Sequence, residues 1–97
     1  MLYLDARSEQ IWADWESIAR QRFGVSTMTL LCARGALDLA CINEDSTLKK
    51  AGEDPDRIFA LRVHRTNIQL LCTISNDLRF LVLLSVEPHP FLVESTL

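Results

Sequence analysis

The chain lacks the features that mark membrane, metal-binding or disulfide-stabilised proteins. A membrane helix needs about 20 consecutive apolar residues, but Ser75, Asn76, Asp77 and Arg79 interrupt the most apolar stretch, "LLCTISNDLRFLVLLSV". The 3 cysteines are odd in number and no pair has the Cys-x-x-Cys spacing, so neither a disulfide framework nor a metal site is expected. Reduced thiols and an N-terminal segment unlike an export signal predict a cytoplasmic protein.

The chain also lacks a concentration of positive charge. Its 10 Lys and Arg are scattered among 13 Asp and Glu, and the net charge is −3. Nucleic-acid binders depend on clustered cations that displace counterions, so no nucleic-acid partner is expected. The segment "STLK" (46–49) has the Ser-x-x-Lys spacing of some acyl-enzymes, but it lacks their accompanying motifs and domain. No catalytic residue and no cofactor are therefore expected.

What the chain does contain is ample apolar content in a short length. Its 97 residues are 48% hydrophobic, which predicts one folded domain, expected over residues 1–87. The elements expected along it, described below, make this domain α+β. Residues 88–97 are predicted to be a tail, because Pro88 and Pro90 cannot donate ladder hydrogen bonds. A domain too small to hide all its apolar side chains often covers them with a partner.

The segment "SEQIWADWESIARQRFG" (8–24) predicts an amphipathic helix. Its apolar side chains fall in one arc at 100° per residue. Ser8 or Asp5 is expected to cap the start, and Gly24 to close the end. Trp15 lies at the centre of the arc and Trp12 at its border, so Trp12 is the better interface candidate.

The segment "TMTLLCARGALDLACIN" (27–43) predicts a β-hairpin. Its apolar residues alternate on both sides of a two-residue turn at Arg34-Gly35. This register places Cys32 and Cys41 on the apolar face, and the alternation around Cys72 does the same for the third cysteine, so all three are expected to act as small hydrophobic side chains.

The second half of the chain predicts a short helix followed by three strands. Asp45 or Ser46 is expected to cap the helix, which is expected to end at Gly52; residues 57–63 fit a strand better than a helix. A three-residue loop, 75–77, is expected to pair Ile74 with Leu78. The predicted fold is thus an N-terminal helix packed on a roughly five-stranded antiparallel sheet, in the order α-β-β-short helix-β-β-β.

This register identifies an unusually apolar second face of the sheet. Leu71, Leu81 and Leu83 point away from the helix, where water should favour polar residues. They are expected to be covered by the tail or by another chain.

The leading hypothesis is a non-enzymatic protein that binds another protein chain, in a hetero-complex or homodimer, as a complex subunit, adaptor or inhibitor. The predicted partner-binding residues are Leu71, Leu81, Leu83, Phe91, Leu92, Val93 and Trp12. The alternative is an immunity or antitoxin-type neutraliser of a basic partner, which would use the acidic residues Glu44, Asp45, Glu53, Asp54 and Asp56. A small enzyme is the least favoured hypothesis, because no polar constellation suits a catalytic pocket.

Overall fold

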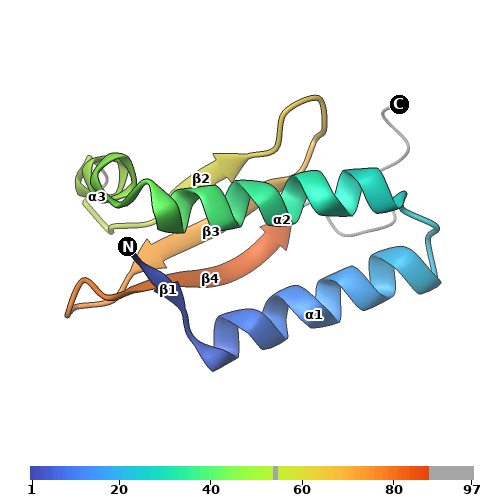
Figure 1. Ribbon diagram of the computed structural model, residues 1–97, viewed down its shortest axis with the longest axis horizontal. Coiled ribbons are helices and arrows are strands. Elements are labelled where there is room, and N and C mark those ends of the chain that lie inside the picture. Colours follow the sequence, from blue (N-terminus) through green and yellow to red (C-terminus); the bar gives the residue numbers. More distant parts are fainter. Residues whose placement is uncertain (54, 88–97) are drawn as a thin grey trace.

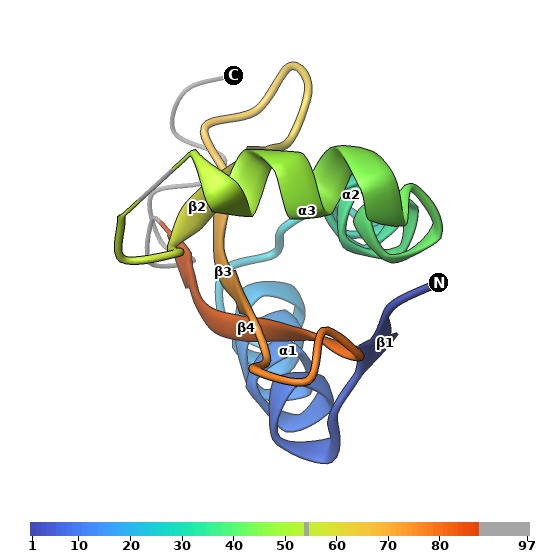
Figure 2. The ribbon, with the colours of Figure 1, turned by 90° about the vertical axis from the view of Figure 1, so that its left-hand side faces the viewer.

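The computed structural model describes residues 1–53 and 55–87, and over these residues three helices pack against a four-stranded mixed sheet (Figures 1 and 2). The strand order is β1-β4-β3-β2; β1 is parallel to β4, and the other neighbours are antiparallel. The predicted α+β class is confirmed, with four strands rather than five. The elements in chain order are β1 (Tyr3–Leu4), α1 (Ala6–Gln21), α2 (Thr27–Ile42), α3 (Glu44–Gly52), β2 (Phe59–Arg62), β3 (Gln69–Ile74) and β4 (Phe80–Glu87).

The N-terminal helix α1 forms as its sequence predicts. The Asp5 carboxylate caps it by accepting a hydrogen bond from the Ser8 backbone N–H at 2.8 Å. Gly24 closes the end at a φ of 62°, in the left-handed region that favours glycine. The helix buries Trp12 and Trp15, which places both tryptophans in the core.

The predicted hairpin over residues 27–43 is wrong, because this segment is the single helix α2. Ser26 caps its start by accepting from the Thr29 backbone N–H, and Gly35 lies in its interior instead of in a turn. Apolar residues are so dense here that both the strand and the helix periodicity fit. Alanine and leucine favour the helix, and α2 buries its residues at helical spacing: Leu30, Ala33, Leu37, Ala40 and Cys41.

The three-strand meander and the short helix α3 are confirmed, but α3 begins at Glu44 with Asn43 at its N-cap position, so the expected cap at Asp45 or Ser46 is wrong. Residues 59–62 form strand β2, and the Val63 backbone N–H donates to the Ile68 carbonyl where the β2–β3 loop begins. The expected pairing of Ile74 with Leu78 is wrong, since Ile74 pairs with Leu81. The Asp77 carboxylate closes a longer loop by accepting hydrogen bonds from the Ser75 hydroxyl and the Arg79 backbone N–H.

The longer loop reverses the faces of β4. Leu81 and Leu83, predicted on the uncovered face, are 0% and 1% exposed and belong to the core beneath α1. A bulge then changes the register, because Cys72 pairs with Leu83 whereas Leu71 pairs with Ser85. Leu71 alone of the three leucines lies on the open face, where it is half-buried.

The short strand β1 and the start of α1 complete the edge of β4. Tyr3 and Leu4 pair with Phe80 and Leu81, after which the chain turns into α1. The Ser8 hydroxyl oxygen then accepts a hydrogen bond from the buried Leu83 backbone N–H at 2.9 Å. The Ser8 side chain of α1 thus supplies the acceptor for a backbone N–H of β4 at a point where the neighbouring strand β1 has already ended.

Candidate docking surface

Helix α2 is apolar on two opposite sides, and only one of them packs against the sheet. In Figure 1 the helix lies in front of β2 and β3, with its other side turned outward. We call this side the outer face. Its four large side chains are more than half exposed: Met28 70%, Leu31 62%, Leu39 56% and Ile42 63%. Cys32 and Gly35 lie between them and are also exposed.

The outer face follows from residue spacing. Residues 28, 32, 35, 39 and 42 are separated by alternating steps of four and three, the spacing with which one helix packs along another. A helix that is apolar all round is normally buried on all sides. The inner half of α2 is buried by the domain, and the outer half is not.

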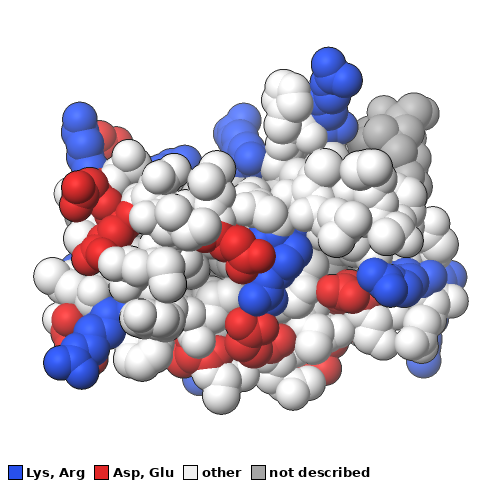
Figure 3. Space-filling view, viewed as in Figure 1, with Lys and Arg blue, Asp and Glu red and all other residues white. Residues whose placement is uncertain are grey.

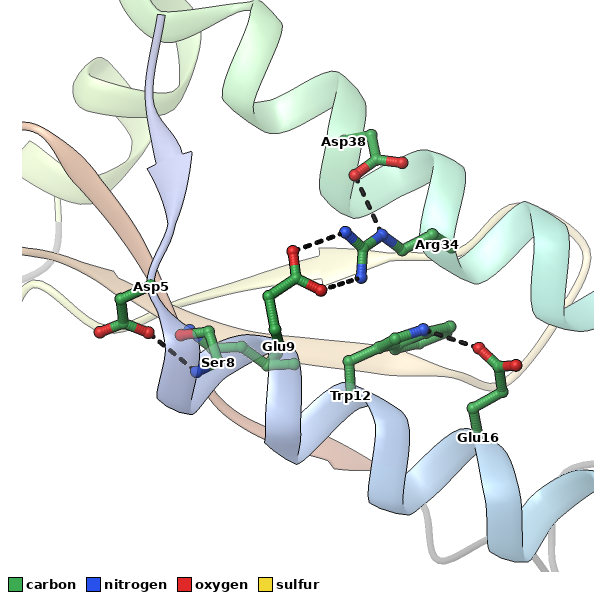
Figure 4. A network of polar contacts seen from close by, with 8 residues as sticks. Asp5, Ser8, Glu9, Trp12, Glu16, Arg34 and Asp38 are labelled. Carbon is green, nitrogen blue, oxygen red and sulfur yellow. Dashed lines mark hydrogen bonds and ion pairs between the residues drawn. The ribbon is translucent and has the colours of Figure 1, made fainter.

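The two charged residues of α2 lie beside the outer face and bind within the domain. Arg34 donates two hydrogen bonds to the Glu9 carboxylate of α1, at 2.9 and 3.0 Å, and one to Asp38 at 3.0 Å (Figure 4). The Arg34 hydrogen bonds lower the pKa of Glu9. These contacts fasten α1 to α2 and leave the outer face without charge at its centre.

A groove of about 730 Å³ runs beside the outer face. One wall is α2, from Met28 to Leu39, and the other is the β2–β3 loop. Arg62 at the end of β2 and Arg65 in the loop line this side, so the wall opposite the helix is basic. Figure 3 shows broad uncharged areas on this side of the molecule, above a central cluster of acidic and basic groups. Such a combination of apolar floor and charged rim is typical of protein-binding surfaces.

The structure does not bring the predicted partner-binding residues together. Trp12 is buried, and its indole N–H donates to Glu16 at 2.8 Å (Figure 4). Leu81 and Leu83 are core residues, so their expected place on an uncovered face is wrong. Leu71 lies on the open face of the sheet. The tail residues Phe91, Leu92 and Val93 lie outside the described residues.

The cysteines occupy two different environments. Cys41 and Cys72 are buried as predicted, but Cys32 is exposed on the outer face. Burial raises the pKa of the Cys72 thiol to about 12 and also raises the pKa of Cys41. Both buried thiols are therefore protonated at neutral pH, the opposite of an activated nucleophile. Within residues 1–53 and 55–87, no group of three or more His, Cys, Asp or Glu side chains could hold a metal ion.

The acidic residues of the alternative hypothesis are divided along the chain. Glu44 and Asp45 lie in the first turn of α3, where negative charge is favourable at a helix N-terminus. Glu53 and Asp56 are exposed after that helix, and Asp54 lies outside the described residues. Their use against a basic partner stays a prediction.

The outer face was missed because its residues were assigned to a hairpin. The signal that could have found it is the four-and-three spacing from Met28 to Ile42, which repeats the spacing of Leu30, Ala33, Leu37 and Ala40 on the opposite side. No helix in the described part of the chain is long and apolar enough to cross a membrane. The chain matches no protein-family model, no curated protein and no solved structure at a significant level.

Proposed function

We propose that this protein is a non-enzymatic protein-binding module that works as a subunit of a complex or as an inhibitor of its partner. The observation that carries the proposal is the outer face of α2, where four large apolar side chains are exposed with nothing in the described domain to cover them. Contiguous apolar patches of this kind usually mark contact sites.

The energetics support a docking role. Burying a Leu, Ile or Met side chain contributes about 1.5 to 3 kcal/mol, and each of the four large side chains of the outer face still has more than half of its surface in water. Covering all four would contribute on the order of 4 to 8 kcal/mol. This is enough to offset much of the entropic cost of association.

The buried, protonated state of Cys41 and Cys72 supports the non-enzymatic part of the proposal. The exposed Cys32 thiol supports a reducing compartment, because free surface thiols persist where disulfides are reduced. A cytoplasmic location is therefore part of the proposal.

The test compares the proteins captured by the wild-type chain and by the double variant Leu31→Gln/Leu39→Gln. Both leucines are exposed, so the variant should keep the wild-type circular dichroism spectrum and melting temperature. The matched control is Leu84→Gln, which changes an exposed leucine of β4 outside the outer face.

We expect the wild type and the Leu84 variant to retain the same partner, and the double variant to lose it. Retention of every captured protein by the folded double variant would refute the outer face as the docking site. Unfolding of the double variant would show that the two leucines belong to the core.

A further inference from the structure

We propose that the outer face binds a second copy of this chain, with the two α2 helices packed antiparallel and crossing at Gly35. The inference rests on the proposed docking function and names its partner. It is argued from the symmetry of the outer face, from the position of Gly35 and from the area that the pair would bury.

The large side chains of the outer face are arranged symmetrically around Gly35. Met28 and Ile42 lie seven residues before and after it, and Leu31 and Leu39 lie four residues before and after it. At about 100° per residue, Met28 and Ile42 are each displaced by about 20° from Gly35, in opposite directions. Leu31 and Leu39 are displaced by about 40°, again in opposite directions.

A two-fold axis perpendicular to α2 at Gly35 therefore matches this face to itself. The axis brings Met28 of one copy to the level of Ile42 of the other, and Leu31 to the level of Leu39. Because the two members of each pair lie on opposite sides of the centre line, their side chains interdigitate instead of colliding. Self-complementarity of this kind is what a symmetric dimer interface requires.

Gly35 has no evident purpose within the monomer. It lies inside a helix, where glycine is less favourable than alanine, and a Cβ built there would meet no atom of residues 1–53 and 55–87 within 4 Å. At the crossing point of two helices, the missing side chain lets the backbones approach closely. The residues next to Gly35 on this face, the exposed Cys32 and the half-exposed Ala36, also have small side chains, and the large side chains lie around them.

On one edge of the proposed helix pair, the charged side chains beside α2 are complementary. The rotation brings Asp38 of each copy near the level of Arg34 of the other copy. Arg34, which already pairs with Glu9 and Asp38 of its own chain, then faces a further carboxylate across the interface. On the other edge, both copies present Arg62 of β2 and Arg65 of the β2–β3 loop on the same side. Added salt should relieve this repulsion, whereas it would weaken binding of an acidic partner to the same loop.

The buried area of the interface determines how strongly the two copies are expected to associate. Two outer faces in contact would bury about 1,000 Å² in total, which is near the lower limit for a specific interface. We therefore expect a reversible dimer with a dissociation constant in the micromolar range.

The first experiment is sedimentation equilibrium of the full chain over a range of micromolar concentrations. The wild type should shift from monomer to dimer. Leu39→Gln and Gly35→Leu should each weaken dimerisation by about ten-fold or more, equivalent to about 1.4 kcal/mol. The control Ala13→Leu also introduces a leucine side chain, at an exposed position of α1, and should dimerise as the wild type does.

The Gly35→Leu variant distinguishes a specific helix crossing at Gly35 from non-specific hydrophobic association. The added leucine enlarges the apolar surface, so non-specific association would become stronger, whereas close packing at Gly35 would be blocked. Stronger or unchanged association of this variant would overturn the crossing at Gly35. A strictly monomeric wild type would overturn the dimer, while the capture experiment above would still decide the docking function separately.

Disulfide cross-linking tests the geometry directly. In a Cys32→Ala background, Gly35→Cys should give a covalent dimer under mild oxidation, because the two crossing positions lie within disulfide reach. Ser17→Cys, at an exposed position of α1, should not. Equal cross-linking of the two variants would contradict the proposed interface.

Discussion

Leu83 provides the sharpest test of the structure, because the sequence pattern assigned it to a partner-binding face and the structure buries it. Its side chain is 1% exposed, whereas that of its neighbour Leu84 is 42% exposed. Truncating a fully buried leucine to alanine costs about 2 to 5 kcal/mol, from lost burial and from the cavity left behind. A domain of this size has a total stability of roughly 5 to 15 kcal/mol. Leu83→Ala should therefore remove a large part of the free energy of unfolding.

The assay is urea unfolding followed by circular dichroism, with Leu84→Ala as the matched control. The two variants make the same chemical change at adjacent positions, so effects on the unfolded chain nearly cancel. At a slope of about 1 to 1.5 kcal/mol per molar urea, Leu83→Ala should lower the midpoint of urea unfolding by about 3 M. Leu84→Ala should cost less than about 1 kcal/mol. An equal or larger effect of Leu84→Ala would refute the observed register of β4.

Three further predictions concern single contacts. Ser8→Ala should cost about 1 to 3 kcal/mol in urea unfolding, because it leaves the buried Leu83 backbone N–H without its acceptor. Asp5→Ala should cost about 1 kcal/mol at pH 7 by removing the helix cap. Hydrogen bonding by the Ser8 side chain, and then by its backbone N–H, lowers the pKa of Asp5. Its contribution is therefore complete above its unfolded pKa of about 4 and is lost as the pH falls through the folded value. Cys32 should react with a chromogenic disulfide reagent in the folded protein, whereas Cys72, with a pKa raised to about 12, should react only on unfolding.

Each of these predictions has a result that would contradict it. Ser17→Ala, at an exposed position of the same helix, should leave stability nearly unchanged; an equal loss would show that the Ser8 hydroxyl is not the important acceptor. A pH-independent effect of Asp5→Ala would exclude the charged cap. Equal reaction rates of Cys32 and Cys72 in the folded state would show that Cys72 is not enclosed.

Local signals in the sequence were sufficient for α1, α3 and the β2–β3 hairpin. Asp5 and Gly24 limit α1 by side-chain capping and by left-handed backbone geometry, both of which depend on neighbouring residues alone. The docking surface was not predictable in the same way. Strand and helix periodicities both fit residues 27–42, and a two-residue turn at Arg34-Gly35 satisfied the strand pattern completely.

The sequence by itself determined an α+β domain with a capped amphipathic helix and antiparallel strands in its second half. Only the tertiary structure decided that residues 27–42 are a helix and which leucines of β4 are buried. The physical reason is that both outcomes depend on partners distant in the chain. α2 is held through Arg34 and Glu9 and by its packing on the sheet, and the register of β4 depends on a loop closed by Asp77, a bulge opposite Leu71 and the Ser8 hydroxyl. Those long-range contacts moved the candidate docking site from β4 to the outer face of α2.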